Sequence, residues 1–463
     1  MSRRYLVLAI CCCSLFIVGM DNTIVNIALP SLQDDLGASL SGLQWTIDAY
    51  TLVLASLLVL AGSTADRIGR RRVFQTGLAL FTAGSLLCSL APSLGWLIVF
   101  RMVQAVGGSM LNPVAMSIIT NTFTDAKERA RAIGVWGAVV GVSLAVGPVL
   151  GGFLVHAIDW RAIFWVNVPV GVAAFLLAWR FVPESRAPHP RRLDPVGQVI
   201  VFVLLASVTY GIIEGPGAGF TSPKILGCFL LGALALAALL LYEPRRAEPL
   251  IELRFFKSVP FSGATLIAVS AFGSLAGFLF LNTLYLQDTR GLSALHAGLY
   301  TLPFAAMTVV FSPLSGRIVG SRGTRLPLTL AGVAFVAGIL PLTQLTPDTP
   351  VWLLFACYVV FGFGFAMVNS PITQTAVSGM PREQAGVAAA IASTSRQVGT
   401  SLGVAVIGAV VAGSTAGFAE ASHAGWWIIV GLGVAVLLLA LITTGRWARS
   451  TTRLTSGTPT HQT

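Results

Sequence analysis

Long apolar runs separated by short polar loops fill most of the chain. A helix needs about 20 apolar residues to cross the ~30 Å hydrocarbon core of a bilayer, and runs of that length recur along the sequence. The pattern predicts membrane-spanning helices near residues 5–30, 43–64, 73–91, 96–119, 130–155, 162–182, 196–214, 223–242, 260–286, 296–319, 326–345, 351–374, 385–413 and 424–445. The runs are continuously apolar rather than alternating, which favours helices over a β-barrel. We therefore expect an all-α membrane protein with fourteen spans.

Composition supports this interpretation and excludes a soluble protein. Charged residues make up 10% of the chain and hydrophobic residues 55%, with a mean hydropathy of +0.82. A typical soluble domain has about 25% charged residues, so this surface suits lipid better than water.

The distribution of the basic residues predicts the orientation of the chain. With the N-terminus in the cytoplasm, 24 of the 29 Lys and Arg residues fall in cytoplasmic segments and 3 fall in outer loops. This bias follows the positive-inside rule and places both termini in the cytoplasm. The net charge of +11 is therefore a topology signal, and no nucleic-acid partner is expected. The N-terminal apolar run lacks a small-residue cleavage site, which predicts an uncleaved first span.

The order of the runs predicts four regions. They are a six-helix bundle at 1–183, two inserted helices with flanking loops at 184–257, a second six-helix bundle at 258–446, and a disordered cytoplasmic tail at 447–463. No direct functional role is expected of the inserted pair. No phosphate-binding motif and no metal-ligand spacing of His residues is present in the sequence, so we expect no cofactor, no metal and no enzyme activity.

A few charged residues lie inside or at the edge of apolar runs, where a charge costs about 2.5–3.5 kcal/mol on insertion scales. Asp21 lies in the first run, Asp48 near the start of the second, and Arg101 and Gln104 in the fourth. Each has a structural alternative. Asp21 could make a hydrogen bond between helices, Asp48 could lie on the outer surface, and Arg101 could tether helices together.

The loop after the second run resembles the signature loop of the major facilitator superfamily. It places Asp66, Arg67 and Arg70 around the flexible Gly69 at the membrane edge, where the charges can hold two helices together. Arg101 and Gln104 also match polar positions of that superfamily. The resemblance implies a fold of two six-helix bundles.

The fifth run resembles the antiporter motif found in exporters of the superfamily. It contains Gly147-Pro148 followed by Gly151-Gly152, although Ser143 stands where the motif begins with glycine. Small residues allow helices to pack closely, and ordinary packing is the alternative explanation. With Asp21 and the Ala28-Leu-Pro30 sequence, the chain is most similar to drug:proton antiporters with fourteen spans.

The resemblance implies a set of site residues. Proton coupling is expected from Asp21, Asp48 and Arg101, because a carboxyl group in apolar surroundings can bind and release protons near neutral pH. The expected substrate cavity contains Asp48, Tyr50, Gln104, Asn112, Asn282, Tyr285, Asn369 and Gln374. Gating is expected from Asp66, Arg67, Arg70, Glu128, Gly147 and Pro148. Asn112-Pro113 and Asn369-Ser370-Pro371 are expected to break their helices.

The expected function is proton-coupled efflux of amphipathic drugs or antibiotics across the cytoplasmic membrane by alternating access. The expected partners are a drug-like small molecule, protons and the lipid bilayer, and the chain is expected to be a monomer. One alternative is a proton-coupled transporter of a nutrient or metabolite. Another is a membrane-embedded enzyme or sensor, although the sequence contains no Ser/His/Asp constellation or soluble signalling domain.

Overall fold

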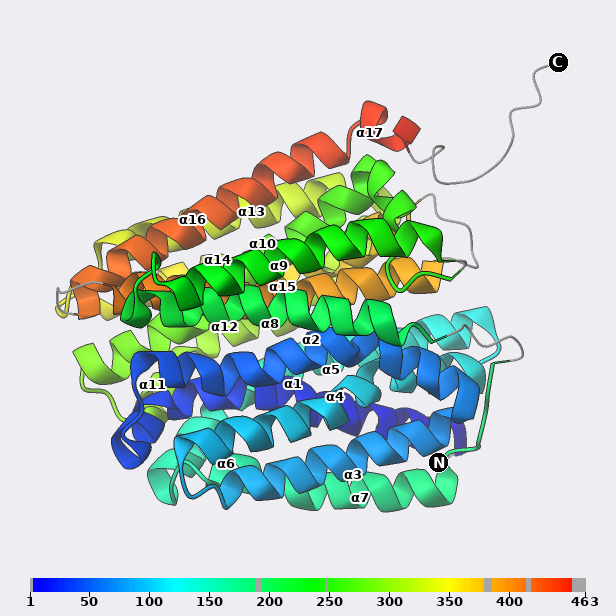
Figure 1. Cartoon of the computed structure of the whole chain (residues 1–463), viewed down its shortest axis with the longest axis horizontal. Coiled ribbons are helices and arrows are strands. Elements are labelled where there is room, and N and C mark those ends of the chain that lie inside the picture. The colour runs from blue at the N-terminus through cyan, green and yellow to red at the C-terminus, as the bar shows by residue number, and fades with distance from the viewer. Residues whose placement is uncertain (1–2, 188–192, 247, 379–384, 414–417, 452–463) are drawn as a thin grey trace.

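The computed structural model describes residues 3–187, 193–246, 248–378, 385–413 and 418–451, and all regular elements in these ranges are helices. Within these ranges, thirteen helical segments are long and apolar enough to cross a membrane. A fourteenth helix, α3 (Arg70–Ser89), has 20 residues and runs beside α4 and α7, but three arginines at its start lower its hydropathy. The long helices lie roughly parallel to one another (Figure 1). The predicted all-α fold is confirmed.

The first group of helices follows the predicted order of spans. It consists of α1 (Arg3–Leu36), α2 (Leu40–Ile68), α3, α4 (Leu94–Thr122), α5 (Ala126–Ala157), α6 (Ala162–Trp165) and α7 (Asn167–Phe181). The sixth span is divided between α6 and α7. This division brings Asn167 to the first position of α7, inside the membrane region rather than in a loop.

Two helices follow, α8 (Pro195–Ala218) and α9 (Pro223–Tyr242), with the short helices η1 (Glu243–Arg245) and η2 (Leu253–Lys257) after them. Asp194 starts α8 by accepting a 3.0 Å hydrogen bond from the Gly197 amide, and Pro195 fits the first helical position. α8 packs against both α2 and α15 (Ala385–Ala412), whereas α9 packs mainly on α8.

The remaining helices form the second bundle. They are α10 (Val259–Leu284), η3 (Tyr285–Thr289), α11 (Ala294–Tyr300), α12 (Leu302–Arg322), α13 (Arg325–Ile339), η4 (Leu340–Gln344), α14 (Val351–Val377), α15 and α16 (Phe418–Thr443). The large buried core of this bundle is rich in aromatic rings, with Phe278 in contact with Phe304, Phe361 and Trp426.

Two predictions about helix breaks were wrong. α4 continues through Pro113 and α14 continues through Pro371, because one missing backbone donor is tolerated in a packed membrane helix. The short helix α17 (Arg446–Ser450) overlaps the start of the expected tail at 447–463, and residues 452–463 of that tail lie outside the described part. The tail and the boundaries at 183/184 and 257/258 stay predictions.

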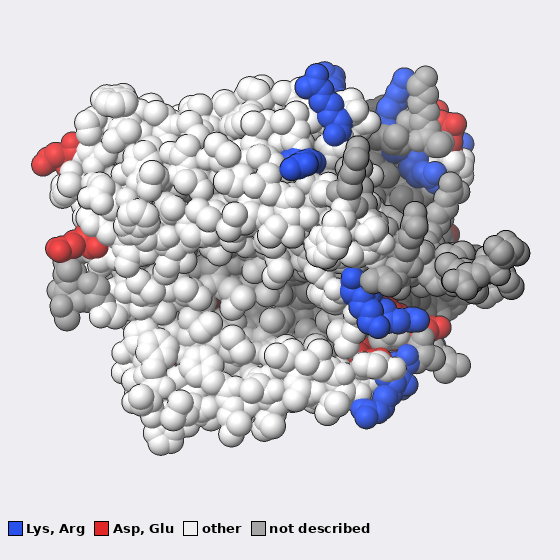
Figure 2. All heavy atoms as spheres, turned by 90° about the horizontal axis from the view of Figure 1, so that it is seen from above, with Lys and Arg blue, Asp and Glu red and all other residues white. Residues whose placement is uncertain are grey.

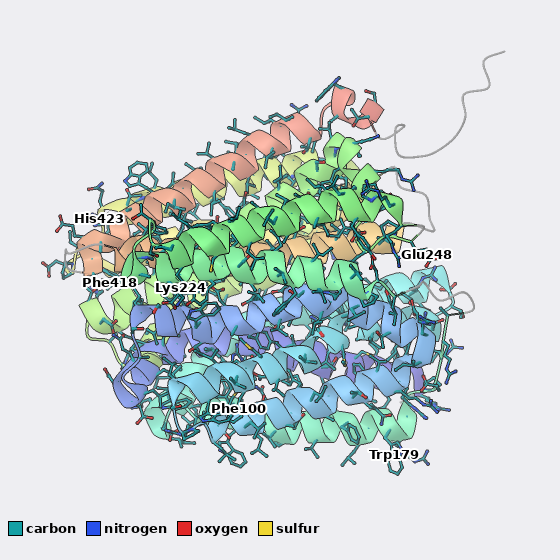
Figure 3. All side chains as sticks on the ribbon, in the orientation of Figure 1. Phe100, Trp179, Lys224, Glu248, Phe418 and His423 are labelled. Carbon is teal, nitrogen blue, oxygen red and sulfur yellow. The ribbon has the colours of Figure 1, made fainter. Side chains whose placement is uncertain are left out.

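Charge separates along the long direction of the helices. On the face in Figure 2, Lys and Arg side chains gather toward one end, and a broad band without charged side chains covers the middle. In Figure 3, Lys224 and His423 lie at the end opposite Glu248. The start of α1 and the helix α17 lie at the same end (Figure 1), as an even number of crossings requires. The chain is therefore a multi-pass membrane protein.

The two bundles meet along α2 and α15 and along α5, α11 and α12. The Gln44 side chain of α2 donates to the carbonyl oxygens of Val404 and Ala405 on α15, at 3.1 and 2.9 Å. Gly152 of α5 lies so close to α11 that an added Cβ would be 2.4 Å from the Ala294 carbonyl oxygen. These contacts hold the two bundles together.

Candidate functional site

A buried network of polar side chains joins four helices of the first bundle. The Arg101 guanidinium of α4 donates to Asp21 Oδ2 of α1 at 2.5 Å and to Gln104 Oε1 at 2.7 Å. The Gln104 and Asn167 amide groups both donate to Asp21 Oδ1, at 2.8 and 3.0 Å. Ser85 of α3 accepts from Gln104 at 2.6 Å and from Asn167 at 3.3 Å. Helices α1, α3, α4 and α7 are thus held together by one carboxylate and its donors.

Arg101 is enclosed on its remaining sides. Its Nε donates to the Thr46 carbonyl oxygen of α2 at 3.2 Å, and its guanidinium lies 4.2 Å from the centre of the Tyr50 ring. The Arg101 side chain is 1% exposed and the Asp21 side chain 0%. A buried ion pair is tolerated only when its hydrogen bonds are satisfied, and here both partners have several.

The network depends on the charge of Asp21. A carboxylate that accepts from three donors acts as an ionised acceptor. Arginine cannot release its proton under these conditions. A proton added to the Asp21 carboxylate would therefore occupy one of its acceptor positions. The new O–H group would then point toward an N–H donor of a neighbouring side chain. The hydrogen bonds that Asp21 accepts therefore join α1 to α4 and α7.

Asp48 has the opposite surroundings. Its side chain is fully buried on α2, and neither of its oxygen atoms has a hydrogen-bond partner of good geometry. It interacts electrostatically with the Ser401 hydroxyl of α15. An unpaired buried carboxylate is costly, so this environment suits the neutral acid or a cation placed beside it. Asp48 does not lie on the outer surface, and it lies outside the hydrogen-bond network around Asp21.

The glycine motif of α5 contacts both bundles. An added Cβ on Gly147 would lie 2.0 Å from Thr23 Oγ1 of α1, and one on Gly151 would lie 2.6 Å from Ile24. On the other face, Pro148 presents its carbonyl oxygen to Gly298 of α11, where an added Cβ would be 2.3 Å away. The motif therefore positions the α1 segment that carries Asp21 and also forms part of the contact between bundles.

The basic loop between α2 and α3 has a partner that the sequence did not indicate. Asp66 Oδ1 accepts from Arg70 at 2.8 and 3.0 Å, as expected for a structured turn. The Glu184 side chain accepts from the Arg71 amide at 3.0 Å and lies within 4.0 Å of the Arg71 and Arg72 guanidinium groups. Gly69 adopts a φ of 125° against Glu184, a conformation that favours glycine.

Glu128, another residue expected in gating, contacts the start of α1 in this structure. Its carboxylate lies 3.5 Å from Arg4 in an exposed ion pair, while Arg67 is exposed. Because Asp66 and Arg70 lie at the turn between α2 and α3 and Glu184 follows the end of α7, these contacts brace the first bundle in this conformation.

The structure places the residues predicted for the substrate cavity in different surroundings in the two bundles. Tyr50 and Gln104 surround Arg101, and Asn112 is half-buried on α4 with its side-chain oxygen unpaired. In the second bundle, Asn282 accepts from Tyr358 and Tyr285 donates to the Thr346 carbonyl oxygen at 2.6 Å, so both are occupied in local contacts. Gln374 is exposed, and the Asn369 carbonyl oxygen accepts from Arg396 at 3.4 Å.

Four contributors to these sites were missed in the sequence. Ser85, Asn167 and Ser401 are small polar residues in apolar runs, and such residues are also common in ordinary membrane helices. Asn167 follows the polar Asp159-Trp160-Arg161 segment at the start of the sixth run, which was the available signal. Glu184 lies in a polar loop with other charges and had no distinguishing signal. Among the described residues, no group of three or more His, Cys, Asp or Glu side chains could hold a metal ion.

Comparison with known families gives one match that extends over most of the chain. The family model described as Major Facilitator Superfamily matches residues 11–404.

Curated relatives are named for drug or antibiotic resistance. The chain is 36% identical to the multidrug resistance protein Stp of Mycobacterium tuberculosis, over 86% of this chain and 74% of that protein. It is 37% identical to the tetracenomycin C resistance and export protein of Streptomyces glaucescens, over 85% and 73% of the two chains. It is 36% identical to the puromycin resistance protein pur8 of Streptomyces alboniger, over 95% and 90%.

Solved structures show the same fold at low sequence identity. A D-xylose-proton symporter has a TM-score of 0.70 at 16% identity, covering 96% of this chain and 98% of that one. A bacterial homologue of the human lysosomal transporter Spinster, in an inward-facing and occupied conformation, has a TM-score of 0.68 at 18% identity and covers 99% of both chains.

Proposed function

Because the chain belongs to the major facilitator superfamily, a family of transporters rather than enzymes, we propose that it exports amphipathic drugs or antibiotics by alternating access. The names of the curated relatives support this substrate class. The contacts of α5 support the direction of transport, because the motif that resembles those of exporters lies between Asp21's helix and the second bundle.

The energy source in this proposal is a proton gradient, and Asp21 is the proton-binding group. The observation that carries it is the network in which Asp21 accepts from Arg101, Gln104 and Asn167. Proton binding would release the donors and allow α1 to shift against α4. Because α1 packs on Gly147 and Gly151 of α5, that shift would reach the contact between bundles.

The remaining parts of the proposal concern place and assembly. The basic end faces the cytoplasm, the protein lies in the cytoplasmic membrane with both termini inside, and it acts as a monomer. The loop of Asp66, Arg70 and Glu184 keeps α2, α3 and the end of α7 together while the bundles rock.

Everted membrane vesicles from a host without other drug pumps test the function. With an acidified lumen, vesicles that contain the chain should accumulate ethidium, and vesicles without it should not. Accumulation should stop when a protonophore collapses the gradient. Ethidium uptake that is independent of the gradient would contradict proton coupling. Absence of gradient-driven uptake for a panel of cationic and neutral drugs would contradict drug export and favour a nutrient or metabolite as substrate.

A further inference from the structure

Two arginines lie deep within membrane-spanning helices, and they differ in their charge partners. Arg101 of the first bundle forms an ion pair with Asp21. Arg396 lies on α15 of the second bundle, and among the described residues no acidic side chain pairs with it or acts on its charge. A charge inside a membrane helix costs about 2.5–3.5 kcal/mol on insertion scales and normally has a partner. The protein itself leaves Arg396 without one in the part that the structure describes.

Neutral groups satisfy only part of the Arg396 guanidinium. Its Nη2 atom donates to Thr373 Oγ1 at 2.5 Å and to the Asn369 carbonyl oxygen at 3.4 Å, both on α14. Its Nε atom is buried and has no acceptor among the described residues. An arginine side chain has five N–H donors. The two contacts with α14 therefore fix the position of the group and leave both its charge and several of its donors available.

The surroundings of Arg396 combine an aromatic ring with partly accessible polar groups. The guanidinium lies 5.8 Å from the centre of the Phe272 ring of α10, and Phe272 packs edge-on against Phe365 at 5.3 Å. Arg396, Phe272, Asn369 and Thr373 are all half-buried. Helices α2, α8, α10, α14 and α16 contact α15 from different sides. The accessible part of Arg396 therefore faces the interior of the protein rather than lipid.

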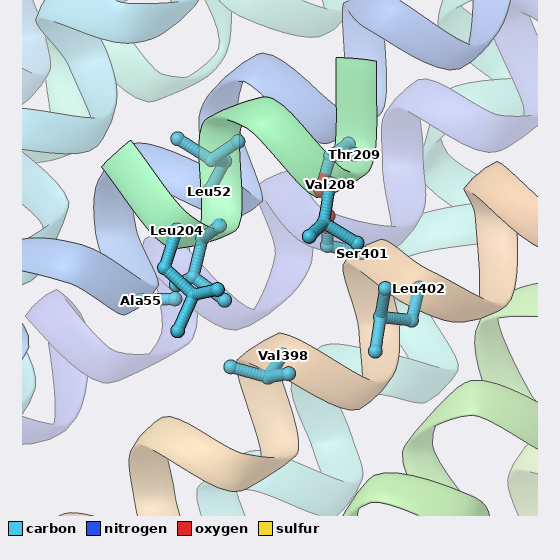
Figure 4. A pocket seen from close by; sticks show the side chains of 9 residues that line it. Leu52, Ala55, Leu204, Val208, Thr209, Val398, Ser401 and Leu402 are labelled. Carbon is cyan, nitrogen blue, oxygen red and sulfur yellow. The ribbon is translucent and has the colours of Figure 1, made fainter. Parts of the chain in front are cut away.

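The opposite face of α15 lies where α8 packs against α2 and α15, a contact region called the α8 seam (Figure 4). Val398 and Leu402 line an apolar cavity of about 130 Å³ there. With 3.6 residues per turn, Arg396 and Val398 point about 200° apart around the helix. Asp48 interacts with Ser401 on the seam face, so the nearest part of the first bundle offers its acid to the wrong side of α15.

We propose that Arg396 binds the anionic group, a carboxylate or sulfonate, of an amphipathic ligand whose apolar part contacts Phe272. Such a ligand supplies the charge partner that the described residues lack. The planar guanidinium matches a carboxylate or sulfonate in shape and forms charge-assisted hydrogen bonds with it. The identification of this ligand as a transported substrate rests on the proposed function, and it adds acidic amphipathic molecules to the substrate class.

A pair of probes that differ only in charge tests the site without transport. The full chain in nanodiscs of phosphatidylcholine would be titrated with anilinonaphthalenesulfonate and with N-phenylnaphthylamine, which has the same aromatic skeleton but no sulfonate. The signal of empty nanodiscs is subtracted. Arg396→Gln removes the charge. Arg322→Gln makes the same change at an exposed residue at the end of α12 and serves as the matched control.

The affinity for anilinonaphthalenesulfonate should fall about tenfold in R396Q, equivalent to about 1.4 kcal/mol. The affinity for N-phenylnaphthylamine should stay within about twofold in R396Q, and R322Q should bind both probes as the unmutated protein does. An unchanged affinity of R396Q for the sulfonate would overturn the proposal. An equal loss for both probes would also overturn it, because Arg396 would then only hold α14 to α15. Absence of saturable binding of the sulfonate by the unmutated protein would do the same.

Two further measurements cover an R396Q variant that does not fold and a lipid headgroup as the bound anion. In the unmutated protein, saturating anilinonaphthalenesulfonate should raise the melting temperature more than saturating N-phenylnaphthylamine does, and equal shifts would overturn the proposal. The ratio of sulfonate affinities between the unmutated protein and R396Q should be the same in phosphatidylcholine and in phosphatidylglycerol nanodiscs. A ratio that falls to about one in phosphatidylglycerol would mean that lipid occupies the site, and would overturn the assignment to substrate.

The vesicle assay separates this inference from the proposed function. If gradient-driven uptake fails while the binding results hold, the transport function is wrong and the anion site stands. If vesicles transport ethidium and the binding results fail, only the anion site is wrong.

Discussion

Asp21 and Asp48 are both fully buried in the first bundle, but their surroundings are opposite. Asp21 accepts hydrogen bonds from three side chains on α4 and α7. Asp48 has no partner of good geometry and faces Ser401 on a helix of the other bundle. The partners of Asp21 belong to its own bundle, whereas Ser401 beside Asp48 belongs to the second bundle. The comparison supports separate roles, with the proton bound at Asp21 and the cationic substrate at Asp48.

The largest effect is expected from Asp21→Asn. The amide cannot compensate the charge of Arg101, and leaving one member of a buried ion pair alone costs about 3–5 kcal/mol. Gradient-driven ethidium uptake in everted vesicles should fall to the level of vesicles without the chain, and the melting temperature should decrease.

Asp348→Asn is the matched control, because it makes the same chemical change at an exposed residue of the described chain. It should leave uptake and melting temperature unchanged. Normal gradient-driven uptake by D21N would remove Asp21 from the coupling mechanism and end the division of roles.

Gly147→Ala should have the next largest effect, since it tests how rigidly the Asp21 helix must be held. The new Cβ would lie 2.0 Å from Thr23 Oγ1 and 3.2 Å from the Met20 carbonyl oxygen, forcing α1 away from α5. Overpacking of this kind costs about 1–3 kcal/mol. We expect reduced ethidium uptake and a lower melting temperature. Gly134→Ala on the same helix meets no atom within 4 Å and should behave as the unmutated protein. If both variants transport normally, close packing at Gly147 is not required.

The membrane-spanning helices could be predicted from the sequence, because a helix that crosses the bilayer must be apolar over most of its length. Even α3 was predicted as a span, although Arg70, Arg71 and Arg72 lower its hydropathy. The centre of the Asp21 network could also be predicted. An acid or an arginine in an apolar run costs free energy in the membrane, so it needs a partner. This reasoning identified Asp21, Arg101 and Gln104 without their contacts.

The remaining parts depend on which helices become neighbours, and hydropathy carries no such information. Asn167 joins the Asp21 network because α7 packs against α1 and α3. Asp48 is fully buried although it lies near the start of its apolar run, where a place on the outer surface was also expected. Tyr285 was predicted for the cavity as a polar aromatic residue, but its hydroxyl is used by the Thr346 carbonyl oxygen of an adjacent loop. Side-chain type alone could not separate these cases.

Asp48→Asn should affect ligand binding more than stability. The substitution removes no hydrogen bond of good geometry, so the melting temperature should stay the same or rise slightly. The affinity for tetraphenylphosphonium in nanodiscs should fall about tenfold, or about 1.4 kcal/mol, because the neutral amide cannot pair with the cation. A neutral drug transported by the protein should bind with unchanged affinity and serves as the control. An equal loss for cationic and neutral ligands would show that Asp48 shapes the site without recognising charge.

The smallest effect is expected from Glu214→Gln, which weakens one attachment of α8 without touching either acid. The Trp45 indole keeps an acceptor but loses a charged one, and hydrogen bonds between membrane helices are worth about 0.6 kcal/mol on average. We expect a slightly lower melting temperature and about a twofold weaker affinity for tetraphenylphosphonium, less than about 0.6 kcal/mol. A double-mutant cycle with Trp45→Phe isolates the contribution of this pair, because the two losses should not add if the residues interact. Gradient dependence of ethidium uptake should be unchanged in all three variants, since the hydrogen bond between Trp45 and Glu214 is not part of the Asp21 network. A changed gradient dependence in E214Q would mean that the α8 seam and the proton site are coupled, and the two acids would then act as one unit rather than two.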